Sequence, residues 1–131
     1  MFVDASALVA MLVGEVEASD LLKRLAKTET RLTSALAVWE ASVAASRILH
    51  RSVKGAGGEV TAMLGILKIE TVAVPASIAS GALDAFDRYG KGRHPAGLNF
   101  GDCFAYACAR HFDMPLMFKG DDFSRTDIEA A

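Results

Sequence analysis

Several acidic residues of this sequence lie in or directly beside apolar segments. Asp4 follows the apolar start of the chain, and Glu40 lies within LAVWEASVAAS, with no Lys or Arg three or four residues away on either side. Asp102 opens the apolar stretch DCFAYACA, and Asp121 and Asp122 come shortly after PLMF. A carboxylate is costly to bury without a partner, so these positions need an explanation.

One explanation is a shared metal site. If the fold gathers these acids, repulsion between like charges raises their pKa values, and a hard divalent cation removes that penalty. Mg²⁺ and Mn²⁺ prefer oxygen ligands. A metal held in this way orients phosphate oxygens and activates a water molecule, which suits the hydrolysis of phosphodiesters.

Each acid also has a simpler explanation when it is taken alone. Asp4 is suited to cap a helix, and Glu40 to lie exposed at the edge of an apolar helix face. Asp102 interacts favourably with the dipole of a helix that begins beside it. Asp121 and Asp122 are ordinary turn residues. These alternatives stay open at the level of the single residues.

The elements that must position these acids are short apolar strands separated by helices. This alternation predicts an α/β fold with a mostly parallel sheet, in which functional sites gather beyond the carboxyl ends of the strands. Asp4 ends the first predicted strand, and the glycines of KGAGG are expected to interrupt the helices. The predicted strands cover residues 1–4, 31–32, 71–75 and 115–118, and the predicted helices cover 7–13, 14–29, 35–53, 59–68, 76–89 and 101–112.

Length and composition bound the possible classes. The chain has 131 residues, of which 52% are hydrophobic, and a formal charge of -2. We expect one domain over residues 1–131, and the composition excludes intrinsic disorder and nucleic-acid binding through net charge alone. We expect Cys103 and Cys108 to be buried thiols. No signal peptide or membrane span is visible, so we expect a cytoplasmic protein.

A basic loop before Asp102 is a candidate RNA-binding rim, because cations near an acidic site help to hold phosphates. A solvated loop is the alternative. Arg47 and Arg51, one helical turn apart, are suited to extend such a rim, whereas Trp39 is expected in the core. The candidate rim residues are Arg88, Lys91, Arg93 and His94.

The apolar content exceeds what one small core needs, which predicts surfaces for partners. The candidates are Leu8, Met11, Leu12, Val13, Leu21 and Leu22.

Four segments together resemble the PIN-domain ribonucleases, and among them the VapC toxins of toxin–antitoxin pairs. They are FVDASAL, WEAS, GKGRHPAGLNFGDCFAYA and PLMFKGDDF, and the resemblance runs from residue 2 to about residue 127. It implies a three-layer α/β/α sandwich with a short, mostly parallel sheet. The long block ending in NFGDCFAYA, joined to KGDDF, is the specific part, whereas D-x-S alone is weak.

The resemblance also implies an active site. The family's acids fall on Asp4, Glu40, Asp102 and Asp121, with Asp4 and Asp102 as ligands of Mg²⁺ or Mn²⁺ and Ser6 as a supporting hydroxyl, unless it only caps a helix. Glu40 and Asp121 would hold waters, complete a second metal site or orient the nucleophile. Many members carry T-x-D-x-D-F where this chain has KGDDF, so Asp122 remains an alternative to Asp121.

As function, the resemblance implies a Mg²⁺-dependent endoribonuclease toxin that forms a homodimer and binds a VapB-like antitoxin. Its substrate would be transfer or ribosomal RNA, cleaved by water to leave a 3′-hydroxyl and a 5′-phosphate. The alternative is an inactive PIN-like module that binds RNA or protein. Phosphatase chemistry of the haloacid type is disfavoured, because Ser6 stands where a second Asp is needed.

Overall fold

The computed structural model describes residues 1–131, and its centre is a sheet of four short parallel strands. The order across the sheet is β3 (Glu70–Val72), β2 (Leu32–Ser34), β1 (Phe2–Val3) and β4 (Leu116–Met117). Phe2 pairs with Leu32 on one side and with Leu116 on the other. The chain therefore adds strands on one side of β1 and finally on the other side, which creates a topological switch point beside β1.

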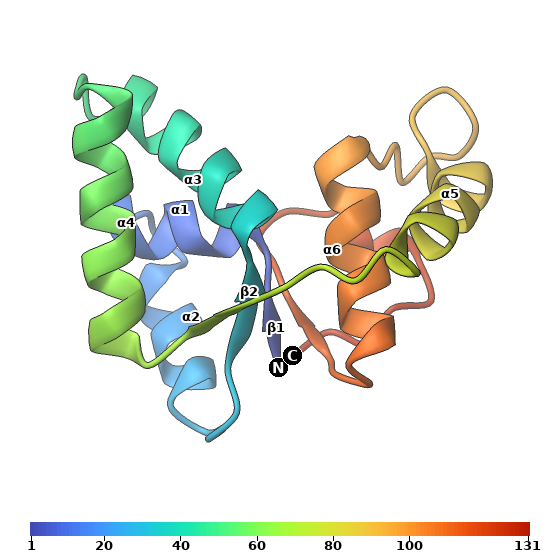
Figure 1. Ribbon diagram of the computed structural model, residues 1–131, viewed down its shortest axis with the longest axis horizontal. Helices are drawn as coiled ribbons and strands as arrows, with labels where there is room; N and C mark the ends of the chain where they lie inside the picture. Colours follow the sequence, from blue (N-terminus) through green and yellow to red (C-terminus); the bar gives the residue numbers. More distant parts are fainter.

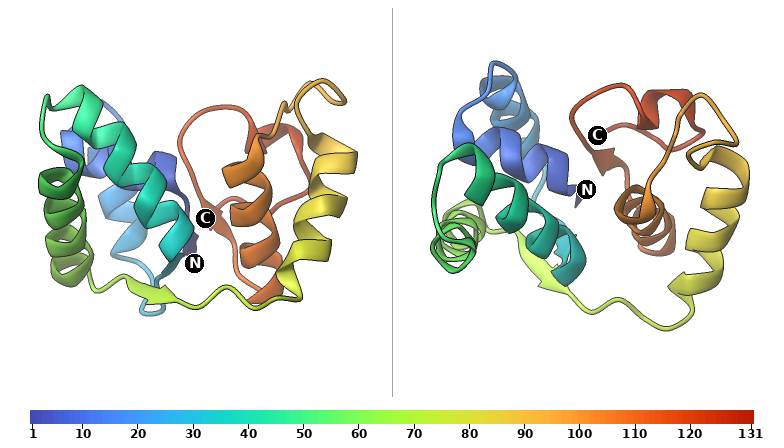
Figure 2. Two further views of the ribbon diagram at one scale, coloured as in Figure 1. Left: turned by 45° about the horizontal axis from the view of Figure 1, so that its top comes forward. Right: turned by 90° about the horizontal axis from the view of Figure 1, so that it is seen from above.

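Helices cover both faces of this sheet (Figures 1 and 2). One layer holds α1 (Ala5–Val13), α2 (Ala18–Leu25), α3 (Ala35–Ile48) and α4 (Val53–Leu67), and the other holds α5 (Ile78–Tyr89) and α6 (Phe100–His111). A short 3-10 helix, Phe123–Arg125, follows β4. The predicted three-layer α/β/α fold with a parallel sheet is confirmed.

The alternation of side chains along the strands divides the core between the layers. Phe2 and Leu116 belong to the core on the α5–α6 side, whereas their neighbours Val3 and Met117 belong to the core on the α1–α4 side. Successive side chains of a strand point to opposite faces, so two residues per strand are enough to supply both cores. All four side chains are fully buried.

The expected helix break at KGAGG is wrong, because these glycines lie inside α4. Ser52 caps this helix, its hydroxyl accepting a hydrogen bond from Gly55 N–H at 3.1 Å. A Cβ placed on Gly57 would lie 3.6 Å from Ser42 Oγ of α3. This distance is an ordinary contact between α3 and α4, and the burial of Ala56 and Val60 on α4 outweighs the low helix propensity of the glycines.

The two helices that follow β1 and β2 begin with side-chain caps. Asp4 accepts a hydrogen bond from Ser6 N–H, and Ser34 accepts one from Ala37 N–H. Asp4 thus has the cap role considered for it, and Ser34 caps α3. The alternative that Ser6 caps the helix is wrong, because Ser6 lies within the first turn of α1.

The apolar surface differs from the expectation in two ways. Trp39 is 63% exposed, so its predicted core role is wrong. Leu8, Met11 and Leu21 are buried and do not form an exposed patch, whereas Leu22 is 38% exposed. Cys103 and Cys108 are buried free thiols, as predicted. None of the helices combines the length and the apolar character needed to cross a lipid bilayer.

Candidate active site

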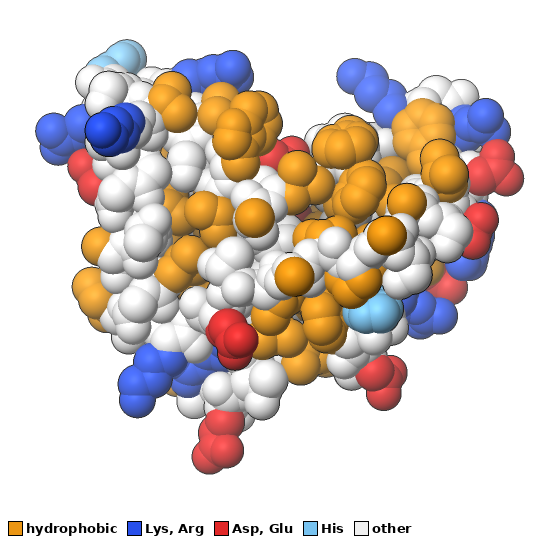
Figure 3. Space-filling model, viewed as in Figure 1, with side chains coloured by type: hydrophobic (Ala, Val, Ile, Leu, Met, Phe, Trp, Pro, Cys, Tyr) orange, Lys and Arg blue, Asp and Glu red, His pale blue; other side chains and the backbone are white.

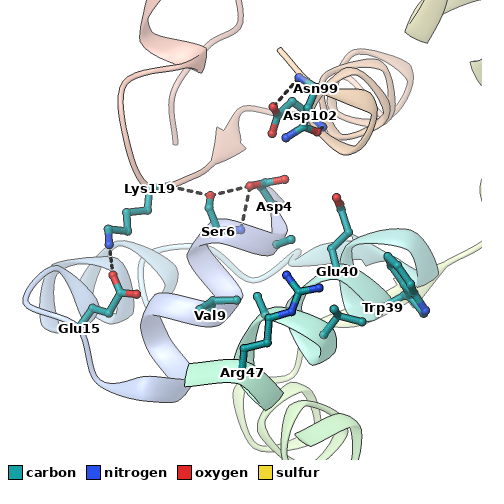
Figure 4. Close-up of a pocket in the computed structure, with 13 residues that line it drawn as sticks. Asp4, Ser6, Val9, Glu15, Trp39, Glu40, Arg47, Asn99, Asp102 and Lys119 are labelled. Atoms are coloured by element: carbon teal, nitrogen blue, oxygen red, sulfur yellow. Dashed lines mark hydrogen bonds and ion pairs between the residues drawn. The ribbon is translucent and has the colours of Figure 1, made fainter. Parts of the chain in front are cut away.

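A cavity of about 510 Å³ opens at the carboxyl edge of the sheet, between the starts of α1 and α6 and one side of α3 from its second turn onward. Figure 4 shows Asp4, Glu40 and Asp102 on its walls. Asp4 caps α1, Glu40 lies in the second turn of α3, and Asp102 lies in the first turn of α6. In Figure 3 the surface is hollowed between the α3 side and the α6 side, and acidic side chains lie in the hollow. The fold therefore brings three of the predicted acids, which are up to 98 residues apart in sequence (102 − 4), to one pocket.

Asp4 is held by the residue two positions later. Its Oδ2 accepts hydrogen bonds from Ser6 N–H at 2.9 Å and from the Ser6 hydroxyl at 2.5 Å. The Ser6 oxygen accepts in turn from Lys119 N–H at 3.0 Å. Ser6 therefore connects the segment after β4 to the carboxylate after β1, and it engages only one of the two Asp4 oxygens.

Asp102 is held in a similar way by a capping box at the start of α6. Asn99 N–H donates to Asp102 Oδ2 at 2.8 Å, and Asp102 N–H donates to Asn99 Oδ1 at 3.0 Å. This reciprocal pair fixes the first turn of the helix and the orientation of the carboxylate. As at Asp4, the bond that positions the side chain uses Oδ2 and leaves Oδ1 for a ligand.

Glu40 reaches across the pocket from α3 to the start of α6. A Cβ placed on Gly101 would overlap both carboxylate oxygens of Glu40. The glycine before Asp102 is thus the reason why Glu40 can lie against the first turn of α6. Of the neighbouring residues Gly101 and Asp102, the sequence indicated only Asp102 as a site residue. The role of Gly101 follows only from the packing.

Burial raises the pKa values of all three carboxyl groups, and the charges of neighbouring acids add to this effect at Glu40 and Asp102. Burial, followed by the charges of Asp4 and Asp102, raises the pKa of Glu40 to about 7. Burial, followed by the charges of Asp4 and Asp122, raises the pKa of Asp102 to about 6, although the Asn99 N–H opposes this. Burial also raises the pKa of Asp4, against the hydrogen bonds from Ser6. Such groups favour a bound cation, because it removes their mutual repulsion.

The two candidates for the fourth acid, Asp121 and Asp122, differ in their effect on the site. The charge of Asp122 contributes to the raised pKa of Asp102, whereas that of Asp121 does not. Both side chains are exposed, and neither lines the cavity. The peptide oxygen of Asp121 accepts a hydrogen bond from the Ser124 hydroxyl. The electrostatic coupling therefore favours Asp122 as the fourth acid near the site.

The predicted basic rim is not brought into the cavity. Arg88 donates to Asp127 at 3.0 Å and to the Tyr89 hydroxyl at 2.6 Å. Arg93 pairs with Asp87 at 2.7 Å. The two remaining rim residues, Lys91 and His94, do not line the cavity either, and His94 Nδ1 accepts a hydrogen bond from Ala96 N–H.

Other cations and an aromatic side chain do line the cavity. Arg47 comes from the second half of α3 and forms no ion pair, and Lys119 follows β4 and pairs with Glu15. The exposed Trp39 lies beside Glu40 (Figure 4). Helical spacing offered a signal for Arg47, two turns after Glu40, but no sequence pattern indicated the pairing of Lys119 with Glu15.

The donor set suits a hard, hydrated cation. No three His, Cys, Asp or Glu side chains lie close enough together to form a compact protein-only metal site. Mg²⁺ does not require one, because it usually keeps several waters and takes one or two carboxylates. Asp4 and Asp102, each with one oxygen fixed by the backbone and by Ser6 or Asn99, fit this mode of binding.

Comparison with known proteins assigns the chain to a family. The PIN domain family model matches residues 1–129. The chain is 42% identical over 130 residues to Ribonuclease VapC of Mycolicibacterium smegmatis, covering 99% of this chain and 98% of that protein. It is 41% identical over 128 residues to Ribonuclease VapC30 of Mycobacterium tuberculosis, covering 98% and 95% of the two chains.

A solved structure shows the same fold. It is the crystal structure of Mycobacterium tuberculosis VapC20, described as a Sarcin-Ricin loop cleaving toxin, with a TM-score of 0.76 at 18% sequence identity. The match covers 99% of this chain and 97% of that one. Fold and sequence therefore lead to the same assignment: the chain belongs to the PIN-domain family and, within it, to the VapC ribonucleases.

Proposed function

We propose that this protein is a Mg²⁺-dependent endoribonuclease that hydrolyses RNA phosphodiesters at the pocket of Asp4, Glu40 and Asp102. Its family makes it a ribonuclease toxin of a toxin–antitoxin pair. The observation that carries the finer proposal is the set of three carboxyl groups that line one cavity, where burial raises the pKa of each and neighbouring acids add to the rise at Glu40 and Asp102. We include Mn²⁺ as a replacement metal, because it has the same preference for oxygen.

In this proposal Asp4 and Asp102 provide the oxygens that hold the metal, and Ser6 and Asn99 keep them oriented. Bound Mg²⁺ would offset the negative charge of the phosphate oxygens and make a water more acidic. Glu40, with a pKa of about 7, accepts the proton of the attacking water. Attack on phosphorus breaks the bond to the 3′-oxygen, so the products carry a 3′-hydroxyl and a 5′-phosphate. Asp122, which was the sequence alternative to Asp121, adds negative charge on the α6 side.

RNA is held by groups that surround these acids. Arg47 lines the cavity without an ion pair and is available to a backbone phosphate. Trp39 offers an exposed ring beside Glu40, on which an unpaired base can stack. These contacts favour a single-stranded loop, such as those of transfer or ribosomal RNA, over a duplex. Lys91 and Arg93 remain candidates for outer contacts on the basic loop.

A VapB antitoxin is the partner that the family implies, and we propose a homodimer in addition. Two apolar grooves are available for these contacts. One lies between α1, α2 and α4, where Leu22 and Ile66 are exposed, and the other lies between α5 and α6, where Leu83 and Phe100 are exposed. Asp substitutions at Ile66 and Leu83 would show which groove serves the dimer, by light scattering of the purified toxin.

The test of activity is cleavage of total cellular RNA by antitoxin-free protein, with Mg²⁺, with Mn²⁺ and with EDTA. An Asp102→Asn variant purified in parallel reports any contaminating nuclease. The proposal expects a few discrete fragments that disappear with EDTA and in the variant. Equal cleavage by the variant would reject the assigned site. Binding of RNA without cleavage, in a folded and metal-replete protein, would favour the alternative of an inactive PIN-like binding module.

A further inference from the structure

We propose that Lys119 is an RNA-binding residue with two positions: bound to Glu15 in the free protein, and bound to a backbone phosphate at the mouth of the pocket when RNA is present. The inference deepens the proposed function and rests on it. It concerns a residue outside the acidic set, in the segment that joins β4 to the 3-10 helix. In this segment the backbone of Lys119 is fixed by a hydrogen bond, whereas its ammonium group is able to move.

The backbone of Lys119 is fixed to the catalytic edge. Its N–H donates to Ser6 Oγ at 3.0 Å, and the Ser6 hydroxyl donates to Asp4. Because this chain of hydrogen bonds ends on the first acid of the site, the Cα of Lys119 keeps its distance from Asp4. Only the side-chain torsions of Lys119 are free to change.

The ammonium group is held at the other end of α1. Lys119 Nζ contacts Glu15, which follows the last turn of α1, and it lies 4.0 Å from a Glu17 oxygen. Glu15 is itself positioned by the helix end, since its N–H donates to Ala10 O at 3.0 Å. The lysine side chain therefore extends along α1 away from Asp4, with Glu15 as its partner, as Figure 4 shows.

The ion pair is placed where a phosphate can compete for it. Both Lys119 and Glu15 line the cavity, and their side chains are 34% and 26% exposed. Partly exposed pairs of this kind contribute little net stability, so a second anion can replace Glu15 at small cost. Arg47 is the only other cation that lines the cavity, against the four acids Asp4, Glu15, Glu40 and Asp102. An RNA strand entering this negative pocket gains from a second cation opposite Arg47.

The experiment measures RNA binding as a function of salt in an Asp102→Asn background, which prevents cleavage. The probe is a short fluorescein-labelled single-stranded RNA, followed by fluorescence anisotropy in EDTA. The variants are Lys119→Met, Lys119→Arg and Glu15→Gln. The control is Lys23→Met, because Lys23 forms an ion pair with Asp20 on α2, at an exposed position outside the cavity.

One lost phosphate contact lowers the slope of log K against log salt by about 0.7 for single strands. We expect this loss for Lys119→Met, and an unchanged slope for Lys119→Arg and Lys23→Met. We expect Glu15→Gln to bind RNA about two- to fivefold more tightly, as release of a partly exposed ion pair allows. Because Glu15→Gln also removes a negative charge from the pocket, the inference requires that this gain disappear when the double variant Glu15→Gln/Lys119→Met is compared with Lys119→Met.

An unchanged slope in folded Lys119→Met would overturn the inference. If circular dichroism shows that this variant does not fold, Lys119→Gln takes its place in both measurements, and an unchanged slope in that folded variant rejects the inference. Failure of the inference differs visibly from failure of the proposed function. In the first case wild-type protein still cleaves RNA with Mg²⁺ and Asp102→Asn still binds the probe, whereas in the second case wild-type protein does not cleave RNA.

Discussion

Two groups of carboxylates in this protein have opposite surroundings. Asp127 accepts hydrogen bonds from the Tyr106 hydroxyl at 2.6 Å and from Arg88 at 3.0 Å, and these partners lower its pKa to about 2. Asp102 and Glu40 lie instead in a pocket where burial and neighbouring acids raise their pKa values to about 6 and about 7. Asp127 thus joins the C-terminal segment to α5 and α6, whereas Asp102 and Glu40 face a cavity.

The two sets of carboxylates have opposite effects on the stability of the folded protein. A carboxylate with its own donors, such as Asp127, stabilises the folded state at neutral pH. In the pocket, Asp4, Glu40 and Asp102 destabilise the metal-free protein when they are ionised, because burial and the charges of neighbouring acids disfavour their charged forms and none of them has an ion-pair partner. Such local conflict is a common property of functional sites, where activity requires an arrangement that is not the most stable one.

The largest expected difference is in the RNA cleavage rate of variants at Asp102 and Asp127. Asp102→Asn should lower RNA cleavage about 10²-fold or more, as loss of a group that takes part in the chemistry does. Asp127→Asn should leave the cleavage rate of the folded protein within about twofold and lower stability by about 1 kcal/mol or less, because its ion pair is exposed. Initial rates with a labelled RNA and thermal melts measure both. Comparable loss of activity in the two variants would remove the distinction between the groups.

Gly101→Ala tests the position of the Glu40 carboxylate without changing any charge. The new Cβ would displace the Glu40 carboxylate from the start of α6, and we expect cleavage to fall about 10- to 100-fold, as for groups that orient catalytic ligands. Alanine has the better helix propensity, by about 1 kcal/mol, so the melting temperature should stay or rise. A variant that keeps full activity would show that Glu40 need not lie against α6.

The aromatic neighbours of the two groups should also differ. Trp39→Ala should weaken binding of single-stranded RNA by about 1 to 3 kcal/mol if one base stacks on the ring, with little effect on stability, because the side chain is exposed. Tyr106→Phe should lower stability by about 1 kcal/mol through loss of the hydrogen bond to Asp127, with RNA binding retained. Anisotropy titrations and melts of both variants test this contrast. Loss of RNA binding in Tyr106→Phe alone would contradict it.

The smallest effect is the pH dependence of stability. The pKa of Glu40 is about 7 in the folded protein against an ordinary value of 4.5, so between these values the folded state binds more protons than the unfolded state. Stability from this group therefore increases as pH falls, the opposite of the trend for Asp127, whose contribution is lost only as pH falls towards about 2.

We accordingly expect the melting temperature of metal-free protein to rise by a few degrees from about pH 8 to about pH 5. Mg²⁺ should stabilise the protein more at the higher pH, where the carboxylates are ionised and bind it better. Glu40→Gln should flatten the pH trend and raise the melting temperature at high pH. A falling melting temperature over this range in wild-type protein would show that the pocket acids are not in conflict.

Much of the architecture was predictable from the sequence because it depends on local patterns. Short apolar strands such as FV and LM, separated by helical segments, predicted an α/β fold with a mostly parallel sheet, whereas the three-layer arrangement was implied by the family resemblance. The acids Asp4, Glu40 and Asp102 were identifiable because carboxylates in apolar segments need a reason. The helix over KGAGG was mispredicted, because the close packing of α3 on α4 is not visible in local propensity.

Other features were decided only by the tertiary structure. The sequence determined which acids are unusual and that a parallel sheet would align strand ends. Only folding placed Trp39 at the pocket, bound Arg88 to Asp127, and set Lys119 between Ser6 and Glu15. The physical reason is that ion pairs and exposure depend on distances between segments far apart in the chain, whereas caps and strand alternation depend on neighbours along it.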